Sequence, residues 1–319
     1  MAVPNRILTV TLLVLLAAAL TVAPLTGQAQ SPAEPPARHP WDLRFVDQPG
    51  LFAFFDSPAG ASTTGKPLDI GDFDGDGCGD IAVTGQNAAH ALDGAWRGSA
   101  GHVRIVMNVC AISGRVLMDD LQPGQTVITV YGAYAGDMAG TETYVADFNA
   151  DGYDDLLFSA QNSDGPAARS NAGAAYVLFG SADFASREDI DLRRPPADLI
   201  AFYGATAEDR FGLWVEGGDF NGDGYHDLLI GANQADGEGD RRINAGEVWI
   251  IYGKPDMAAA YGPVTDMAAP PADATRIIGA DYDDLMGSCV WGDDLNADGY
   301  ADAIVSAGLW RASSGVGGL

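Results

Sequence analysis

Basic residues are scarce in this sequence: 17 Lys and Arg stand against 44 Asp and Glu, giving a formal net charge of −27. Proteins that bind nucleic acid gain much of their affinity when clustered Lys and Arg neutralise phosphates. An acidic excess of this size repels phosphate instead. The composition therefore excludes a nucleic-acid binder.

Catalytic signatures are also missing. The four histidines are scattered, and neither an H-E-x-x-H metal motif nor a G-x-S-x-G nucleophile elbow occurs. Residues 60–66 resemble a phosphate-binding loop, but Pro67 stands where a Ser or Thr would hold Mg²⁺. The sequence therefore predicts a chain that is not an enzyme, with the alternative that a catalytic part lies beyond residue 319.

Cysteine is too rare for a disulfide scaffold, since there are only three: Cys78, Cys110 and Cys289. A single Cys78–Cys110 bridge is compatible with an exported protein. The alternative is that the cysteines are separate small apolar residues.

Only one long hydrophobic run is present, from Ile7 to Val22, after Arg6 and before the small residues Gly27-Gln28-Ala29. This order is typical of a secretory signal peptide, predicted at residues 1–29, and the run is shorter than the ~20 residues of a membrane span. Residues 30–50 are predicted to be a Pro-rich linker. We expect a mature chain without a membrane span, secreted, at the cell surface or in a periplasm.

What the sequence does contain is glycine, 41 residues, and a repeat. Four segments align without gaps, and their first aspartates are 75, 72 and 75 residues apart. A glycine stands seven residues before each segment, at positions 65, 140, 212 and 287. This regularity indicates one supersecondary unit copied along the chain. The aligned segments are 72–85, 147–160, 219–232 and 294–307.

Each unit is predicted to be β. Short apolar runs such as 156–158 and 228–230 are bounded by Asp and Gly turns, and Tyr/Val/Ile-rich runs such as 175–179 and 247–252 follow. These runs predict four antiparallel strands per unit. Four short strands cannot bury two apolar faces alone, so neighbouring sheets must stack, and radial stacking gives an all-β propeller.

The strand count predicts an incomplete ring. Residues 51–55 are expected to be an outer strand before the first full unit, of the kind that completes the last blade of a ring. Three complete blades follow, and the fourth has two strands, because its third strand is due at 320–323. About three and a half blades are thus expected in 51–319, as part of a larger ring of perhaps seven.

The repeated loop predicts a metal site. Oxygen donors at positions 1, 3, 5 and 9, with Gly at position 6, can surround one ion, and hard oxygen donors favour Ca²⁺. We expect about four calcium sites. Their predicted ligands are Asp72, Asp74, Asp76 and Asp80; Asp147, Asn149, Asp151 and Asp155; Asp219, Asn221, Asp223 and Asp227; and Asp294, Asn296, Asp298 and Asp302.

Two other interpretations of this loop compete with a calcium site. Asx-Gly turns by themselves favour Asp, Asn and Gly, which explains one loop more easily than four in the same register. An EF-hand would need a bidentate Glu at position 12. That position is Val83, Phe158, Ile230 or Val305, each in an apolar β-type run, so EF-hands are excluded.

The loop, the strand after it and Phe211-Gly212 upstream resemble FG-GAP repeats, those of integrin α N-terminal propellers. The resemblance covers residues 51–319. It implies a calcium-binding propeller that acts as an adhesion or protein-interaction module. The alternatives are a non-catalytic propeller within a larger secreted hydrolase, or a carbohydrate-binding propeller.

The resemblance also implies that a protein or glycan ligand binds the face opposite the calcium loops. Two sets of loops would form that face, at 86–100, 161–172 and 233–245, and at 133–139, 205–211 and 280–286. The residues expected to be exposed there are Trp96, Tyr134, Arg169, Arg241 and Arg242.

Overall fold

The computed structural model of this chain describes residues 52–55, 67–111, 114–117 and 126–308. The predicted signal peptide and linker and the loop at 60–66 lie outside these residues. The chain divides into two compact units. The smaller unit contains β1 (Phe52–Phe55) and β7 (Gly114–Leu117), which pair in parallel. The larger unit contains all the strands described below.

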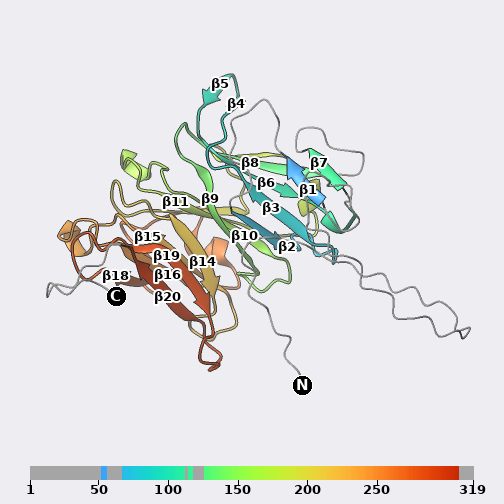
Figure 1. Cartoon of the computed structure of the whole chain (residues 1–319). Coiled ribbons are helices and arrows are strands. Elements are labelled where there is room, and N and C mark those ends of the chain that lie inside the picture. Colours follow the sequence, from blue (N-terminus) through green and yellow to red (C-terminus); the bar gives the residue numbers. More distant parts are fainter. Residues whose placement is uncertain (1–51, 56–66, 112–113, 118–125, 309–319) are drawn as a thin grey trace, which may run out of the picture. The chain divides into compact units, whose positions relative to one another are not determined.

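The larger unit is a series of antiparallel sheets whose strands follow one another along the chain (Figure 1). The first sheet has β2 (Leu68–Gly71), β3 (Asp80–Thr84), β6 (His102–Val106) and β8 (Val127–Tyr131). The second has β9 (Ala139–Ala146), β10 (Asp155–Ala160), β11 (Ala174–Leu178) and β13 (Leu199–Tyr203). The third has β14 (Trp214–Gly218), β15 (Asp227–Ala232), β16 (Glu247–Ile251) and β18 (Thr275–Ile278). The fourth has β19 (Met286–Asp293) and β20 (Asp302–Ala307).

Apolar cores lie between successive sheets. On β10, Leu156 and Phe158 pack into a cluster shared with the first sheet, whereas Leu157 between them packs into a cluster shared with the third. All three side chains are fully buried. The continuous apolar run is therefore explained by a sheet that is covered on both faces. The predicted all-β fold is confirmed, and these stacked four-stranded sheets form part of a β-propeller.

Two sheets carry a fifth strand that the sequence did not predict. β12 (Ile190–Asp191) pairs in parallel with the outer edge of β8, and β17 (Val264–Asp266) pairs in the same way with β13. Both come from the loop between the third and fourth strands of the following sheet. We call β12 and β17 straps. Each strap covers an edge whose backbone groups would otherwise be unpaired.

The strand expected at 51–55 is present as β1. It lies 20 to 17 residues before Asp72, the same distance at which β8 and β13 precede the next repeated aspartate. Its partner is β7, which begins 42 residues after Asp72, close to the 43 and 45 residues at which the straps begin after Asp147 and Asp219. β1 is therefore an outer strand by position, and within the described residues it pairs with β7.

Short elements occupy the remaining connections. β4 (His90–Leu92) and β5 (Ala95–Arg97) form a hairpin around Asp93 and Gly94, which both have positive φ. The Asp-Gly pair is a known signal for this turn, although the sequence analysis expected a plain loop. The helical segments are η1 (Val109–Ala111), η2 (Pro166–Ala168), η3 (Phe184–Ser186), η4 (Glu238–Asp240) and α1 (Met257–Tyr261). Among the described residues, no helix has the length and apolar character needed to cross a membrane.

Candidate metal centres

The four predicted metal loops each connect the first and second strands of a sheet. We call them the Asp loops: residues 72–80, 147–155, 219–227 and 294–302. Position 12 lies in a strand in every repeat, which confirms that these are not EF-hands. At position 6, Gly77, Gly152, Gly224 and Gly299 have φ between 83° and 94°. Nothing lies within 4 Å of where their Cβ would be, so the backbone conformation alone requires glycine.

The first aspartate folds each loop. In the second loop, the two carboxylate oxygens of Asp147 accept the backbone N–H groups of Asp151 at 3.1 Å and Gly152 at 2.9 Å. The same two bonds recur in the other three loops. The position 3 oxygen accepts the position 5 N–H, and position 5 accepts the position 7 N–H, in all four. These side-chain-to-backbone hydrogen bonds are Asx turns, so the turn preference of Asp and Asn contributes to the loop structure. The bonds hold all four loops in one conformation.

The ninth residue links each of the first three loops to its sheet, whereas Asp302 in the fourth accepts the N–H of Leu295 within the loop. Asp155 is fully buried, and its oxygens accept the N–H of Phe148 at 3.0 Å and of Gly180, after the third strand, at 2.8 Å. Asp80 and Asp227 make the equivalent bonds. Burial raises the pKa of Asp155 to about 8, and that of Asp80 and Asp227 to about 6, although these bonds favour the charged form.

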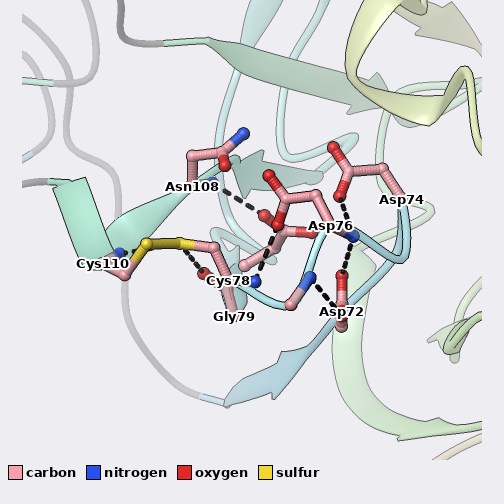
Figure 2. The surroundings of a disulfide bond; sticks show 9 residues. Asp72, Asp74, Asp76, Cys78, Gly79, Asn108 and Cys110 are labelled. Atoms are coloured by element: carbon pink, nitrogen blue, oxygen red, sulfur yellow. Dashed lines mark hydrogen bonds between the residues drawn. A yellow bond between two sulfur atoms is a disulfide. The ribbon is translucent and has the colours of Figure 1, made fainter.

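The first loop brings three carboxylates together. Oxygens of Asp72, Asp74 and Asp80 lie within 4.8 Å of one another. Figure 2 shows two of these side chains, Asp72 and Asp74, in the loop. Asp76 is outside this group, and its Oδ1 accepts the N–H of Cys78 at 2.7 Å. The other loops have Asn at position 3, an uncharged oxygen donor with the same backbone bonds. Each carboxylate oxygen that accepts one N–H keeps a second lone pair, so this donor set fits a hard divalent cation.

A disulfide joins Cys78 and Cys110, with 5.7 Å between their Cα atoms. Of the two alternatives for these cysteines, the bridge is therefore the one found, while Cys289 is free and exposed. Figure 2 shows the bridge beside the first Asp loop. It connects position 7 of that loop to the segment after β6, close to Asn108, whose N–H bonds to Asp80. The loop with the most carboxylates is thus also cross-linked.

The residues expected on the opposite face fall into two groups. Trp96 and Tyr134 are 72% and 57% exposed, and Arg241 is also exposed, as expected. Arg169 was expected to be exposed, but its side chain is only 18% exposed because it pairs with Asp266 and donates to Gly204 O at 3.0 Å. Arg242 is half-buried and donates to Gly279 O at 2.7 Å.

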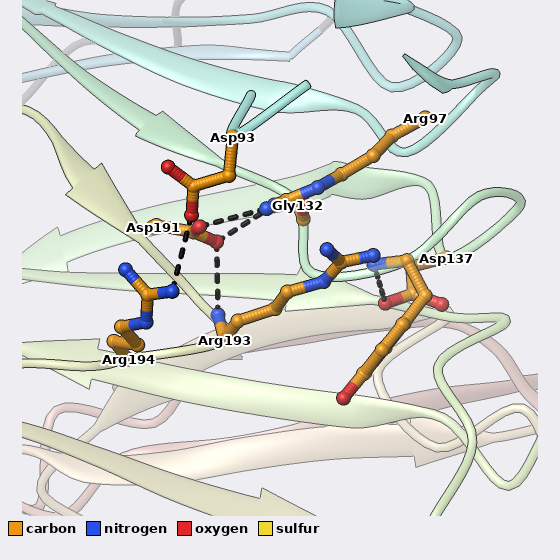
Figure 3. Close-up of polar contacts among 8 residues, drawn as sticks. Asp93, Arg97, Gly132, Asp137, Asp191, Arg193 and Arg194 are labelled. Carbon is orange, nitrogen blue, oxygen red and sulfur yellow. Dashed lines mark hydrogen bonds and ion pairs between the residues drawn. The ribbon is translucent and has the colours of Figure 1, made fainter. Parts of the chain in front are cut away.

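Arg97 is a buried arginine that the sequence alone does not single out. Its side chain is 1% exposed, donates to Gly132 O at 2.9 Å, and makes a bidentate pair with Asp191 at 2.7 Å for both bonds (Figure 3). The available signal was that each loop between the second and third strands contains arginine: Arg97 in the first, Arg169 in the second, and Arg241 and Arg242 in the third. Arg97 pairs with Asp191, 94 residues away, and Arg169 pairs with Asp266, 97 residues away. No local sequence pattern reveals contacts over such separations.

Comparison with known proteins agrees with this geometry. The FG-GAP repeat model matches residues 139–178 and 211–251. The chain is 27% identical over 251 residues to integrin alpha-PS2 of Drosophila melanogaster, covering 77% of this chain and 15% of that protein. It is 25% identical over 262 residues to integrin alpha pat-2 of Caenorhabditis elegans, covering 76% and 18%.

A second kind of relative is a phosphatidylinositol-glycan-specific phospholipase D of Dictyostelium discoideum, 26% identical over 193 residues, or 58% of this chain and 19% of that protein. The chain spans less than a fifth of the length of each of these relatives. The chain therefore contains FG-GAP repeats, and over about three quarters of its length it is similar to integrin α chains.

Proposed function

We propose that this chain is an extracellular calcium-binding propeller that serves as a non-catalytic adhesion or interaction module. The observation that carries the proposal is the cluster of Asp72, Asp74 and Asp80 oxygens within 4.8 Å, in a loop whose hydrogen bonds recur in three further repeats. Because these hydrogen bonds already order the loops, binding an ion costs little further conformational entropy. Extracellular modules of this ligand type bind calcium at ~10⁻⁴–10⁻³ M.

The proposed location outside the cytoplasm has two supports. The sequence predicts a signal peptide at residues 1–29. The Cys78–Cys110 disulfide is of a kind that persists in oxidising compartments and is rare in the cytosol. For the interaction role, the supports are the similarity to integrin α chains and the exposed Trp96 and Tyr134. Aromatic residues of this kind are enriched at protein interfaces.

Calorimetric titration with Ca²⁺ tests the proposal. The wild-type chain is compared with Asp74→Ala, which removes one donor of the first cluster, and with Glu188→Ala, which removes the same charge at an exposed position outside the loops. We expect calcium uptake by the wild-type chain and by Glu188→Ala, and the loss of one site in Asp74→Ala. No uptake by the wild-type chain would refute calcium binding.

A second candidate function follows from the other relatives. Four of the similar proteins are named phosphatidylinositol-glycan-specific phospholipase D. On that basis the chain would be the non-catalytic propeller of a larger secreted hydrolase. The two candidates differ in what accompanies the propeller, so sequencing the rest of the reading frame distinguishes them.

A further inference from the structure

The straps β12 and β17 bind the outer edges of the first two sheets through the same set of contacts. At β8, the strap residue Asp191 lies opposite Tyr131 and receives the Arg97 guanidinium, which also holds the carbonyl of Gly132. The next strap residue, Leu192, donates its N–H to Tyr131 O at 3.1 Å and is 7% exposed. Figure 3 shows the carboxylate of Asp191 facing the guanidinium of Arg97.

The second copy repeats this arrangement at β13. Asp266 lies opposite Tyr203 and receives Arg169, which also holds the carbonyl of Gly204. Met267 then donates its N–H to Tyr203 O at 2.9 Å and is 1% exposed. Both straps thus present an aspartate followed by a large apolar residue. The aspartate binds the arginine, and the apolar residue is buried.

The third sheet has the receiving half of this arrangement. Arg242 donates to the carbonyls of Gly279 at 2.7 Å and Ala280 at 3.2 Å, in the place of Arg97 and Arg169. Among the described residues it has no carboxylate partner, and β18 has no neighbour on its outer side. Ile277 is half-buried, whereas its counterparts in the two strapped strands, Val130 of β8 and Phe202 of β13, are fully buried.

We propose that the outer edge of β18 is a docking site for an extended segment in which Asp is followed by Leu or Met. The occupant is the corresponding loop of a further repeat unit of this kind. It adds as a short parallel strand, places its aspartate opposite Ile278, and forms a charge-assisted pair with Arg242. The next residue donates its N–H to Ile278 O and covers Ile277. This proposal does not depend on calcium binding.

A peptide made from this chain's own second strap tests the site. The peptide spans residues 263–271, and a matched peptide carries Asp266→Asn. The full chain is compared with Arg242→Gln and with Arg241→Gln, which makes the same charge change at the adjacent exposed arginine. Binding is measured by nuclear magnetic resonance, with peptide up to millimolar concentration and the amides around residues 275–280 as reporters.

We expect the peptide to shift the β18 amides of the wild-type chain and of Arg241→Gln, and its affinity for Arg242→Gln to fall by about tenfold or more. The Asp266→Asn peptide should show the same loss on the wild-type chain, which decides the question even if Arg242→Gln folds poorly. No shift at millimolar peptide, shifts away from β18, or equal binding of the two peptides overturns the proposal.

Discussion

At the scale of single residues, Glu216 on β14 is an acid whose surroundings oppose its ionisation. Burial, with the nearby charges of Asp69 and Glu142, raises its pKa from about 4.5 to about 8. Between these values the folded state binds more protons than the unfolded state, so the free energy of unfolding falls as the pH rises. We expect the free energy of unfolding of Glu216→Gln to exceed that of wild type by about 1–3 kcal/mol at pH 8 and to equal it at pH 4.

Urea unfolding at the two pH values measures this effect. Glu188→Gln, a change at an exposed acid, serves as the control and should match wild type at both. A Glu216→Gln variant that is no more stable than wild type at pH 8 would contradict the assignment.

Arg97 makes a second residue-scale prediction, because its charge is buried and has one carboxylate partner, Asp191. Hydrogen bonds from Arg97 hold the pKa of Asp191 below its usual range. Asp191→Asn leaves the arginine charge uncompensated, and we expect a loss of about 3 kcal/mol in the free energy of unfolding. The matched change is Asp93→Asn, whose pair with Arg194 is exposed and should cost less than about 1 kcal/mol. Equal losses in the two variants, measured by denaturant titration, would show that Asp191 has no special role.

At the scale of elements, the disulfide links the first Asp loop to η1, the short helical turn that follows the first sheet's third strand. The bridge closes 32 residues of sequence separation, and cross-links of this length stabilise by about 3 kcal/mol. We expect reduction, or the double change Cys78→Ser and Cys110→Ser, to lower the melting temperature. The first loop should also bind calcium more weakly, because position 7 is then less restrained. A Cys289→Ser variant controls for loss of a thiol and should melt like wild type.

Glycines at the start of the third strands set how closely sheets approach. Gly173 has φ +83°, and a Cβ there would lie 2.2 Å from the carbonyl oxygen of Phe211 in the next repeat. Gly152 has φ +93° with nothing nearby. Both alanine variants pay the left-handed backbone penalty of about 1–2 kcal/mol. Gly173→Ala must also separate two backbones, so we expect thermal unfolding to show a clearly larger loss for it than for Gly152→Ala.

How much the sequence could predict depends on how local each contact is. The Asp loops close on themselves within nine residues, so their spacing predicted both the loop and the strand after it. The straps could not be predicted this way, because Arg97 and Asp191 are 94 residues apart. Arg169 and Arg242 were consequently expected on an open surface, whereas both hold backbone carbonyls.

At the scale of the whole molecule, four ions would act together on one stacked set of sheets. Binding to the folded state alone stabilises by RT ln(1 + [L]/Kd), about 1.4 kcal/mol per site at ten times Kd. We expect EDTA to lower the melting temperature and Ca²⁺ to restore it, whereas Mg²⁺, which requires stricter octahedral geometry, should restore less. Identical melting curves in EDTA and in Ca²⁺ would contradict the prediction.

The straps also have a consequence for folding during synthesis, because each strap is made after the strand edge that it covers. β8 ends at Tyr131, yet the residues that cover its edge and neutralise Arg97 are not made until Asp191. A nascent chain that has left the ribosome only to about residue 180 therefore presents a bare strand edge to chaperones, whereas one that has emerged to about residue 200 does not. The first and second sheets are thus each completed by a segment that is synthesised later, as part of the sheet that follows.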